Sequence, residues 1–582
     1  MNNPKFGSNP ILDFANNHEF GEYKEEPGLK RVVVFGDTSH KCPTYITRLP
    51  PCTKSCPADE DIRGFHNILT GVEKFENKWE AAFQRITDKN PFPAIMGRVC
   101  PHPCETGCNR CMQDDAVGIN SVEHAIGDYG IENNLQLDQP QTATGKHIAV
   151  VGGGPAGLSA AYHMARRGHE VTIYDDREKL GGMMRYGILE YRVGRDVLDA
   201  EIQRIINLGV HTKMGMRIGR DITLDDLKNQ YDAVFVGVGA QKGGPLPVPG
   251  FDQSDMATNA IDFLCDYEMN KDAMRVGKNV VVVGDGDVSM DAVRLALRMG
   301  SKAQLLSAVP RPEMNASDME YEDAVREGTQ IREQVSVIEV LTSDGKVTGV
   351  KCVKMEKKAQ GEDGWNSPVP FLRYKPVEGS EFTIECDMLV AAIGQRTDMS
   401  GLENLTNGGP WLNVDNFYRI KGEEKVFGGG DAVKIDLITT AVGHGRKAAE
   451  AMHEYLNGRQ PQRQGFQEVI PYEKLYTYYF TESAQAPRPH PEIKEIKGNF
   501  NETLKSLDQA AVEEESKRCM SCGLCFECRQ CMKYCPQEAI SYFKQNAVGE
   551  VMWTDYNKCV GCHICAQVCP TGFIHMGMGE DL

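Results

Sequence analysis

The chain has 582 residues, 41% of them hydrophobic, which is typical of a globular protein with roughly two to four domains. Its net charge of −18 disfavours a nucleic-acid partner held by phosphate contacts, and an acidic surface suits docking to a basic protein. Because the chain has no run of about 18 apolar residues and no charged N-terminal region followed by an apolar core, we expect no membrane span, no secretory signal and a cytoplasmic location.

The 20 cysteines gather near the two ends of the chain. Seven lie between Cys42 and Cys111 and ten lie between Cys519 and Cys569. The other three are expected to be small buried side chains: Cys265, Cys352 and Cys386. Since disulfides are rare in a reducing cytosol, the two groups indicate metal or redox chemistry.

The N-terminal part is predicted to consist of a polar arm at 1–35, wrapping a partner or a neighbouring domain, and a largely helical domain at 36–140 that carries the first group of cysteines. The cysteines of this part have irregular spacing: Cys42, Cys52, Cys56, Cys100, Cys104, Cys108 and Cys111. Seven thiols are one fewer than two four-cysteine clusters require. Either one cluster takes a ligand other than cysteine or only one cluster forms, and spacing alone leaves zinc as an alternative.

A dinucleotide-binding fingerprint opens the segment 145–265. An apolar run at 148–151, typical of a buried parallel strand, leads directly into GGGPAGL and a helical segment. The next strand ends at an aspartate that can bind a ribose hydroxyl, and the glycines allow the backbone to approach a pyrophosphate. The residues expected to hold this nucleotide are Gly152, Gly154, Pro155, Ala156, Gly157 and Asp175.

A second fingerprint follows in the segment 266–380. The apolar strand at 280–283 runs into GDGDVS, in which a serine takes the place of the third glycine. A small residue at that position still permits close packing of helix and strand. The residues expected to hold a second nucleotide are Gly284, Gly286, Asp287 and Ser289.

The flanking sequences indicate which nucleotide each fold binds. Gly182 and Arg185 follow the first fingerprint, and a strand-like run, CDMLVAAIGQ, precedes Gly430 and Asp431 at the start of a helix. Flavoproteins with two dinucleotide-binding folds place an aspartate at this point on the flavin ribityl chain. We therefore predict that 145–265 and 381–460 form an FAD domain, into which the NAD(P) domain is inserted.

The C-terminal part is predicted to be a Pro- and Gln-rich linker at 461–510, which either swings or docks, followed by a ferredoxin domain at 511–582. Two copies of C-x2-C-x2-C-x3-C-P match the bacterial two-cluster run, whose fourth cysteine ligates the other cluster. The first predicted cluster takes Cys525, Cys528, Cys531 and Cys569. The second takes Cys559, Cys562, Cys565 and Cys535. Cys519 and Cys522 belong to neither run and are alternative ligands, a redox pair or bystanders.

Three stretches carry a resemblance to the small (beta) subunit family of glutamate synthase, whose relatives include the N-terminal half of dihydropyrimidine dehydrogenase. They are NPFPAIMGRVCPHPCETGC, LGGMMRYGILEYRV and GGGDA. With its ferredoxin tail, the chain looks similar to the NADH-linked flavoprotein of the dissimilatory sulfite reductase system and to flavin subunits of 2-oxoacid or aldehyde oxidoreductases.

This resemblance implies two N-terminal [4Fe–4S] clusters, one of them with a ligand that is not cysteine. Position by position, it assigns to that cluster Cys56, Cys100, Cys104 and Glu123. The other cluster would take Cys52 and Cys108. The family's upstream C-x2-C-x4-C is broken here, and Cys42 and Cys111 are the cysteines expected to complete the set.

The resemblance also bears on the nicotinamide cofactor. NADPH-using members end the strand after the second fingerprint in Tyr-Arg-Arg, which pairs with the 2′-phosphate. The matching residues here are Ser307, Ala308 and Val309, and Arg311 is the only nearby cation. Each lost charge-assisted contact is worth about 1.5–3 kcal/mol, so we predict NADH rather than NADPH.

The expected fold is α/β, with two Rossmann-like domains between an N-terminal helical iron–sulfur domain and a bacterial 2[4Fe–4S] ferredoxin domain. We expect an NAD(P)H:acceptor oxidoreductase that passes electrons between NADH and a protein partner or larger complex through FAD and the clusters. No side chain is expected to act as a catalytic acid or base, and a homodimer is compatible with the family. The alternatives are an electron-bifurcating flavoprotein and a non-catalytic carrier subunit. A thiol–disulfide oxidoreductase is disfavoured because no cysteine lies between Cys111 and Cys265.

Overall fold

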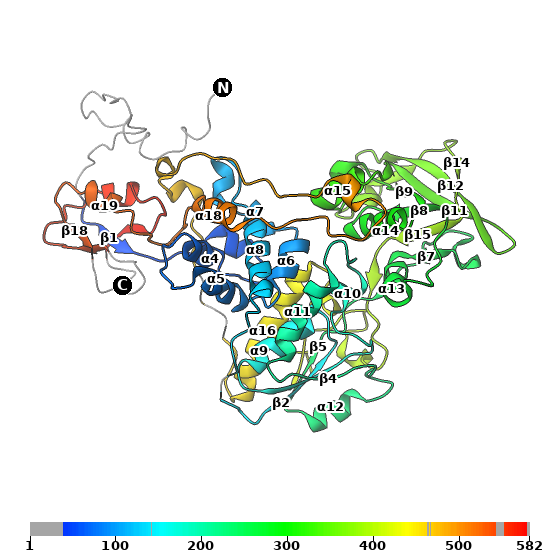
Figure 1. Ribbon diagram of the computed structural model, residues 1–582, viewed down its shortest axis with the longest axis horizontal. Helices are drawn as coiled ribbons and strands as arrows, with labels where there is room; N and C mark the ends of the chain where they lie inside the picture. The colour runs from blue at the N-terminus through cyan, green and yellow to red at the C-terminus, as the bar shows by residue number, and fades with distance from the viewer. Residues whose placement is uncertain (1–38, 141, 463–464, 466, 543–551, 579–582) are drawn as a thin grey trace.

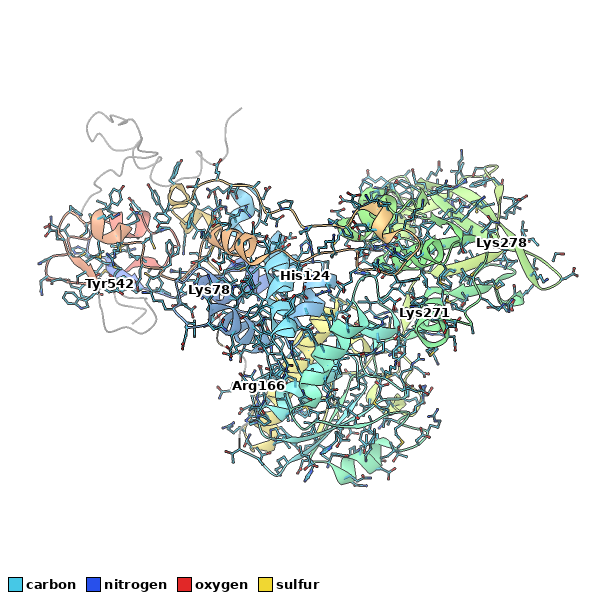
Figure 2. The ribbon with its side chains drawn as sticks, viewed as in Figure 1. Lys78, His124, Arg166, Lys271, Lys278 and Tyr542 are labelled. Atoms are coloured by element: carbon cyan, nitrogen blue, oxygen red, sulfur yellow. The ribbon has the colours of Figure 1, made fainter. Side chains whose placement is uncertain are left out.

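In the computed structural model, residues 39–140, 142–462, 465, 467–542 and 552–578 are described (Figure 1). The arm expected at 1–35 lies outside these residues. A central helical domain lies between a C-terminal domain at one end of the long axis and the second nucleotide fold at the other, with the first nucleotide fold beside it (Figure 1). Figure 2 places Tyr542 and Lys278 toward these two ends and His124 between them. None of the helices in the described part of the chain is both long and apolar enough to span a bilayer.

The first nucleotide fold is a parallel five-stranded sheet in the order β17-β5-β2-β3-β4. Its strands are β2 (His147–Val151), β3 (Glu170–Tyr174), β4 (His211–Lys213), β5 (Ala233–Val236) and β17 (Val426–Gly428). Alternate strand residues pack against α9 (Pro155–Ala165) and α16 (Ile438–Leu456) on one face. The opposite face packs against α12 (Leu224–Gln230). Because β17 lies next to β5, the chain returns to this sheet after the insertion, as predicted.

The second fold is a parallel sheet in the order β10-β9-β8-β15-β7. It contains β7 (Ala257–Asn259), β8 (Asn279–Gly284), β9 (Lys302–Leu306), β10 (Gln330–Arg332) and β15 (Met388–Ala392). One face packs on α13 (Ala260–Asn270) and α14 (Asp287–Arg298), with α15 (Asp318–Arg326) alongside α14. The other packs on an antiparallel sheet of β11 (Val335–Ser343), β12 (Lys346–Lys357), β13 (Tyr374–Pro376) and β14 (Phe382–Glu385).

This sheet extends beyond the expected limits of 266 and 380. Strand β7 and the start of α13 precede residue 266, and β15, the run predicted to belong to the FAD fold, pairs in parallel with β8. The run MLVAA is apolar at every position, so its composition suits a buried strand in either sheet. Only the pairing with β8 assigns it to the second sheet.

The helical domain covers 51–132 and rests on the first fold. It consists of α3 (Pro51–Ser55), α4 (Ile62–Leu69), α5 (Lys78–Thr87), α6 (Pro93–Val99), α7 (Pro103–Thr106), a 3-10 turn (Asn109–Met112) and α8 (Ile119–Glu132). Helices α6 and α8 touch where Gly127 leaves no room for a side chain, since its Cβ would lie 2.2 Å from the backbone nitrogen of Ala94. The buried carboxylate of Glu201, on α11 (Arg195–Ile206), accepts the amides of Ala94 and Ile95 at 2.9 and 3.0 Å. This bond fixes the first turn of α6 to the first fold.

The C-terminal domain contains the hairpin of β18 (Ile540–Tyr542) and β19 (Met552–Thr554) and the short helices α19 (Gln530–Lys533) and α20 (Ile564–Gln567). Its last strand, β20 (Ile574–Gly577), pairs antiparallel with β1 (Cys42–Tyr45). Residues near 42 therefore belong to the C-terminal domain and not to the helical domain. Helix α18 (Gln509–Lys517), which leads into this domain, packs on α4 and α8.

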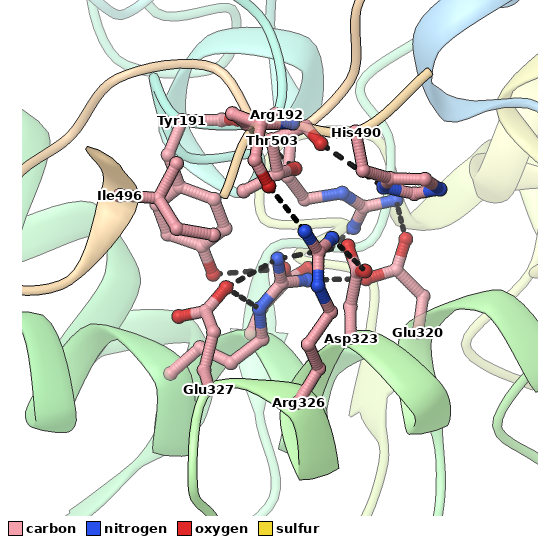
Figure 3. A network of polar contacts seen from close by, with 12 residues as sticks. Tyr191, Arg192, Glu320, Asp323, Arg326, Glu327, His490, Ile496 and Thr503 are labelled. Atoms are coloured by element: carbon pink, nitrogen blue, oxygen red, sulfur yellow. Dashed lines mark hydrogen bonds and ion pairs between the residues drawn. The ribbon is translucent and has the colours of Figure 1, made fainter. Parts of the chain in front are cut away.

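Residues 467–508, here called the strap, take the place of most of the expected linker. The strap is docked along its length: the Ile470 amide donates to the Leu49 carbonyl at 3.0 Å, and the Thr503 amide donates to the Tyr191 carbonyl at 2.9 Å. A polar network ties it to the second fold (Figure 3). There Arg298 donates to the Asn499 carbonyl at 2.5 Å and to the Ile496 carbonyl at 3.2 Å.

Candidate functional site: a nucleotide cavity, a second nucleotide loop and four sets of ligands

The first fingerprint forms a tight turn between β2 and α9. Gly152 has φ +97°, and a Cβ there would lie 2.4 Å from the Gly237 carbonyl oxygen. A Cβ on Gly157 would lie 1.8 Å from the carbonyl oxygen of Gly152. Neither position accepts a side chain, so these two glycines bring the start of α9 against β2 with its free amides exposed to a ligand.

A cavity of about 300 Å³ opens beside this turn. The predicted residues that line it are Gly152, Gly154, Pro155, Ala156, Asp175, Gly182, Gly430 and Asp431. Gly157 does not line the cavity; it packs against the Gly152 carbonyl on the other side of the turn. Arg185 does not line the cavity, in contrast to the prediction: its guanidinium donates to the Leu180 carbonyl at 2.7 Å and pairs with Asp199. It therefore braces the Gly181–Gly182 loop.

Two carboxylates line the cavity, of which Asp175 is buried and Asp431 is half-buried. Asp175, at the end of β3, accepts the amide of Gly153 at 2.6 Å and that of Arg177 at 2.8 Å, so it also holds the glycine turn in place. Asp431 follows β17, and burial raises its pKa to about 6. A carboxyl of this kind suits hydroxyl groups of a ligand, which can donate to it.

The cavity has a cationic side that sequence reasoning missed. Arg177, Arg217 and Lys242 line it, and Asp398 bridges two of them, at 2.7 Å from Arg217 and 2.9 Å from Lys242. Although partial burial opposes it, bonding to Ser400, Lys242 and Arg217 holds the pKa of Asp398 well below its usual value. These cations lie far apart in the sequence and have no motif spacing, so no sequence signal was available. Their charges suit a pyrophosphate.

The second fingerprint forms the same kind of turn between β8 and α14. A Cβ on Gly284 would lie 2.5 Å from the Ala392 carbonyl oxygen, and nothing lies within 4 Å of a Cβ on Gly286. The buried Ser289 donates to the Gly286 carbonyl at 2.6 Å, which supports the view that a small residue suffices there. Asp287 accepts the Ser317 amide at 2.8 Å and so ties the turn to the start of α15.

The end of β9 contains no free cation among the described residues that follow it directly. Ser307 and Val309 are fully buried, and the Ser307 hydroxyl donates to the Val309 carbonyl at 2.8 Å. Arg311 donates to the Ala316 carbonyl at 2.9 Å, pairs with Asp318 and lies 4.3 Å from the centre of the Tyr321 ring.

The C-terminal cysteines form the two predicted groups. The first four thiols line one small cavity and interact with one another: Cys525, Cys528, Cys531 and Cys569. The second group also lies together: Cys535, Cys559, Cys562 and Cys565. The crossing of the fourth cysteine from each run to the other group is thus present in the fold.

In the helical domain, the predicted Cys56, Cys100, Cys104 and Glu123 also lie together. Burial and the Glu123 carboxylate both raise the pKa of the Cys100 and Cys104 thiols. A second buried carboxylate, Glu60, lies beside them, and Asn90 donates to both Glu60 and Glu123 at 3.0 Å.

The remaining cysteines contradict part of the expected second N-terminal set. Cys52 and Cys108 line a small cavity whose other thiols come from Cys519 and Cys522. Cys42 lies on β1 against the Cys559 thiol in the C-terminal domain, because β1 pairs with β20. Cys111 is exposed and does not line the cavity.

All 20 cysteines are free thiols. Within the described part of the chain, no three His, Cys, Asp or Glu side chains converge closely enough to hold a single metal ion.

One contact connects the cavity to the first cysteine set of the helical domain. Ile438 and Ala441 of α16 line the cavity, and a Cβ on Gly443 would lie 2.2 Å from the Pro57 carbonyl oxygen. Lys447 also donates to that carbonyl at 3.3 Å. Since Pro57 follows Cys56, the start of α16 touches both sites.

Comparison with known proteins assigns the family. Residues 146–445, the two nucleotide folds, match the family described as pyridine nucleotide-disulphide oxidoreductase. The chain belongs to this family. Residues 37–135 match the dihydropyrimidine dehydrogenase domain II with a 4Fe-4S cluster, and residues 524–573 match the 4Fe-4S dicluster domain. Within the family the chain is therefore of the glutamate synthase small-subunit and dihydropyrimidine dehydrogenase type, and the predicted fold class is confirmed.

Curated relatives support the same assignment over most of the chain. The beta subunit of NADP(+)-dependent formate dehydrogenase from Moorella thermoacetica is 32% identical over 508 residues, covering 81% of this chain and 70% of the relative. The beta subunit of the NADPH-Fe(3+) oxidoreductase from Geobacter sulfurreducens is 34% identical over 515 residues, covering 81% and 75%. The dihydropyrimidine dehydrogenase subunit PreT of Escherichia coli, named as NAD-dependent, is 30% identical over 412 residues, covering 70% and 91%.

This pyridine nucleotide-disulphide oxidoreductase is an NAD(P)H-dependent iron–sulfur flavoprotein, with FAD and NAD(P) as nucleotides and 4Fe-4S clusters in its N- and C-terminal parts. No cysteine is among the described residues that line the first-fold cavity. The donor sets fit these groups: the glycine turns fit the nucleotides, and the sets of free thiols fit iron–sulfur clusters.

Proposed function

We propose that this chain is the electron-transfer subunit that passes electrons between NADH and a protein partner. The observation that supports this function best is the order of the sites. The cavity touches the Cys56 set through Gly443 and Pro57, and further cysteine sets follow toward the far end of the C-terminal domain. A row of sites that leads from a nucleotide fold to the end of the molecule suits electron delivery to another protein.

FAD, when bound, accepts two electrons from a nicotinamide and releases them singly to iron–sulfur clusters. The residues of the chain hold and orient it. Under this proposal the start of α9 and the cations Arg177, Arg217 and Lys242 bind the pyrophosphate, while Asp175 and Asp431 accept hydrogen bonds from ribose and ribityl hydroxyls.

The proposed preference for NADH rests on the end of β9. Ser307 and Val309 are fully buried and Arg311 is already paired with Asp318, so the described residues that directly follow β9 offer no unpaired cation to a 2′-phosphate. The names of the relatives do not decide this point, since they include both NADP- and NAD-dependent proteins.

The proposed partner is a larger oxidoreductase, such as a dissimilatory sulfite reductase or a 2-oxoacid or aldehyde oxidoreductase. Two relatives are named as beta subunits, of a formate dehydrogenase and of an Fe(3+) oxidoreductase, which supports a role within a multisubunit enzyme. The C-terminal domain at the end of the long axis offers the terminal clusters to such a partner (Figure 1).

Anaerobic titration with each nicotinamide tests the proposal. We expect NADH to bleach the flavin and to produce EPR signals of reduced clusters, with a much weaker response to NADPH. Bleaching by NADPH alone would contradict the preference for NADH but would not contradict the proposed electron-transfer function. No bleaching by either nucleotide would contradict the proposed electron entry and favour a carrier subunit that another protein reduces.

A further inference from the structure

The cavity that holds Cys52 and Cys108 is built from three separate parts of the chain. Cys52 lies on α3, Cys108 precedes the 3-10 turn at 109–112, and Cys519 and Cys522 follow α18 more than 400 residues later. The C-x2-C spacing of the last two is one that iron–sulfur ligands use, since two thiols on a tight loop can reach two irons of one cluster. The cavity thus offers the four thiols that a [4Fe–4S] cluster needs.

Specific bonds fix the Cys519–Cys522 segment against the helical domain. Ser521 donates to the Asn67 side-chain oxygen at 2.5 Å, and Arg63 donates to the Cys522 carbonyl at 2.7 Å. A Cβ on Gly523 would lie 2.5 Å from the Arg48 carbonyl oxygen, so the next residue is held equally closely. The two thiols therefore keep fixed positions beside Cys52 and Cys108.

The polar lining of the cavity points to a bound anionic group. His66 is 1% exposed and lines the cavity; its Nδ1 bonds the Ser516 hydroxyl at 3.1 Å, while its Nε2 has no hydrogen-bond partner. Arg63 and Arg110 line the same cavity. Four thiolates make a cluster anionic, so the Arg63 guanidinium and the imidazole N–H at the cavity wall would stabilise it, while the charge of Arg110 is paired with Asp114 at 2.5 Å.

We propose that Cys52, Cys108, Cys519 and Cys522 bind a [4Fe–4S] cluster that joins the helical domain to the C-terminal domain. This inference rests on the proposed function, in which clusters connect the flavin to the dicluster. It replaces the expected ligands Cys42 and Cys111, of which the first lies against Cys559 and the second is exposed.

The assignment gives an unbroken row of four clusters. Cys52 belongs to the new set, and Cys56, four residues later, belongs to the Glu123 set. In the same way, Cys108 belongs to the new set and Cys104 belongs to the Glu123 set. Cys522 belongs to the new set, and Cys525, three residues later, belongs to the first dicluster set. Chain geometry limits such ligand pairs to Cα separations of about 11–14 Å, so each cluster lies close to the next.

Metal analysis of the anaerobically purified full chain tests the assignment. We expect Cys519→Ser/Cys522→Ser to lose about four iron and four sulfide per chain and to keep its FAD. The matched variant Cys42→Ser/Cys111→Ser should lose none. Loss from the Cys42/Cys111 variant alone, or about one zinc per wild-type chain at this site, would overturn the proposal.

A second comparison separates shared ligation from general damage. Cys52→Ser should lose the same iron as Cys519→Ser, and combining the two should remove no more than either alone. Additive losses would overturn the shared site. If the variants fail to retain FAD, the iron content of the wild-type chain tests the proposal instead. About sixteen iron atoms per chain supports the row of four clusters, and about twelve overturns it. Flavin bleaching by NADH in wild-type chain tests the proposed function independently of this count.

Discussion

The Pro57 carbonyl oxygen lies 2.2 Å from the position that a Cβ on Gly443 would take. This approach brings the segment that follows Cys56 onto α16, whose first turns line the nucleotide cavity. The neighbouring Arg446 strengthens the junction, since it is 2% exposed and bonds Asp59 at 2.5 Å. The absence of a side chain at Gly443 therefore allows the segment that follows Cys56 to approach the helix that lines the cavity.

Gly443→Ala should push the two elements apart, because the atoms it meets are backbone and cannot rotate away. We expect a loss of about 1–3 kcal/mol in stability and slower reduction of the clusters after flavin bleaching. Stopped-flow absorbance with NADH separates the two steps, and the melting temperature reports stability. Gly409→Ala, where nothing lies within 4 Å of the new Cβ, is the matched control. Equal cluster-reduction rates in both variants would contradict the role of this contact.

Asp431 should make the stability of the FAD-free protein depend on pH. Burial raises its pKa to about 6 from 3.8, so the folded chain favours the protonated form. Stability from this group is present at low pH and is lost as pH rises from about 4 through 6, to a total of about 3 kcal/mol.

Asp431→Asn removes this loss, so its melting temperature without FAD should exceed that of wild type by more at pH 8 than at pH 5. FAD binding by the variant should be weaker, because the amide also carries donors. Asp272→Asn, at an exposed position, is the control for the general effect of removing one carboxylate. A gain that is the same at both pH values would show that Asp431 is not the titrating group.

Arg298 should anchor the strap to the second fold. It is 5% exposed, pairs with Glu327 at 2.7 Å and donates to the strap carbonyls of Ile496 and Asn499. Arg298→Ala removes this donor from the two strap carbonyls, while Glu327 keeps its bond from Arg294 at 2.8 Å, and we expect a loss of about 1–3 kcal/mol. Hydrogen exchange of residues 491–504 should rise strongly. Arg275→Ala removes an exposed pair with Asp255 and should change stability by less than about 1 kcal/mol. Unchanged exchange in the Arg298 variant would contradict the anchoring role.

The sequence predicted those features that depend on local spacing. Both glycine turns and the crossed dicluster sets follow from residues a few positions apart, and each is present in the fold. Gly152 and Gly157 illustrate why: their steric requirement is set by the turn itself.

Features that depend on distant pairing could not be predicted. Cys42 was grouped with its neighbours in sequence, but β1 pairs with β20, more than 500 residues away. The position of Cys519 beside Cys52 depends on the docking of α18 onto α4 and α8. The strand β15 has no polar face, so its composition could not say which sheet it joins.

The end of β9 offers a direct test of nucleotide choice. Ala308 is half-exposed between the buried Ser307 and Val309, so a long side chain there can reach solvent without disturbing the strand. Ala308→Arg should add one charge-assisted contact to a 2′-phosphate, worth about 1.5–3 kcal/mol, which is roughly a ten- to hundredfold shift in kcat/KM toward NADPH. Ala308→Gln has a similar reach without the charge and should leave the preference for NADH unchanged. If the two variants shift alike, the charge is not the cause; if neither shifts, residue 308 does not face the 2′ position.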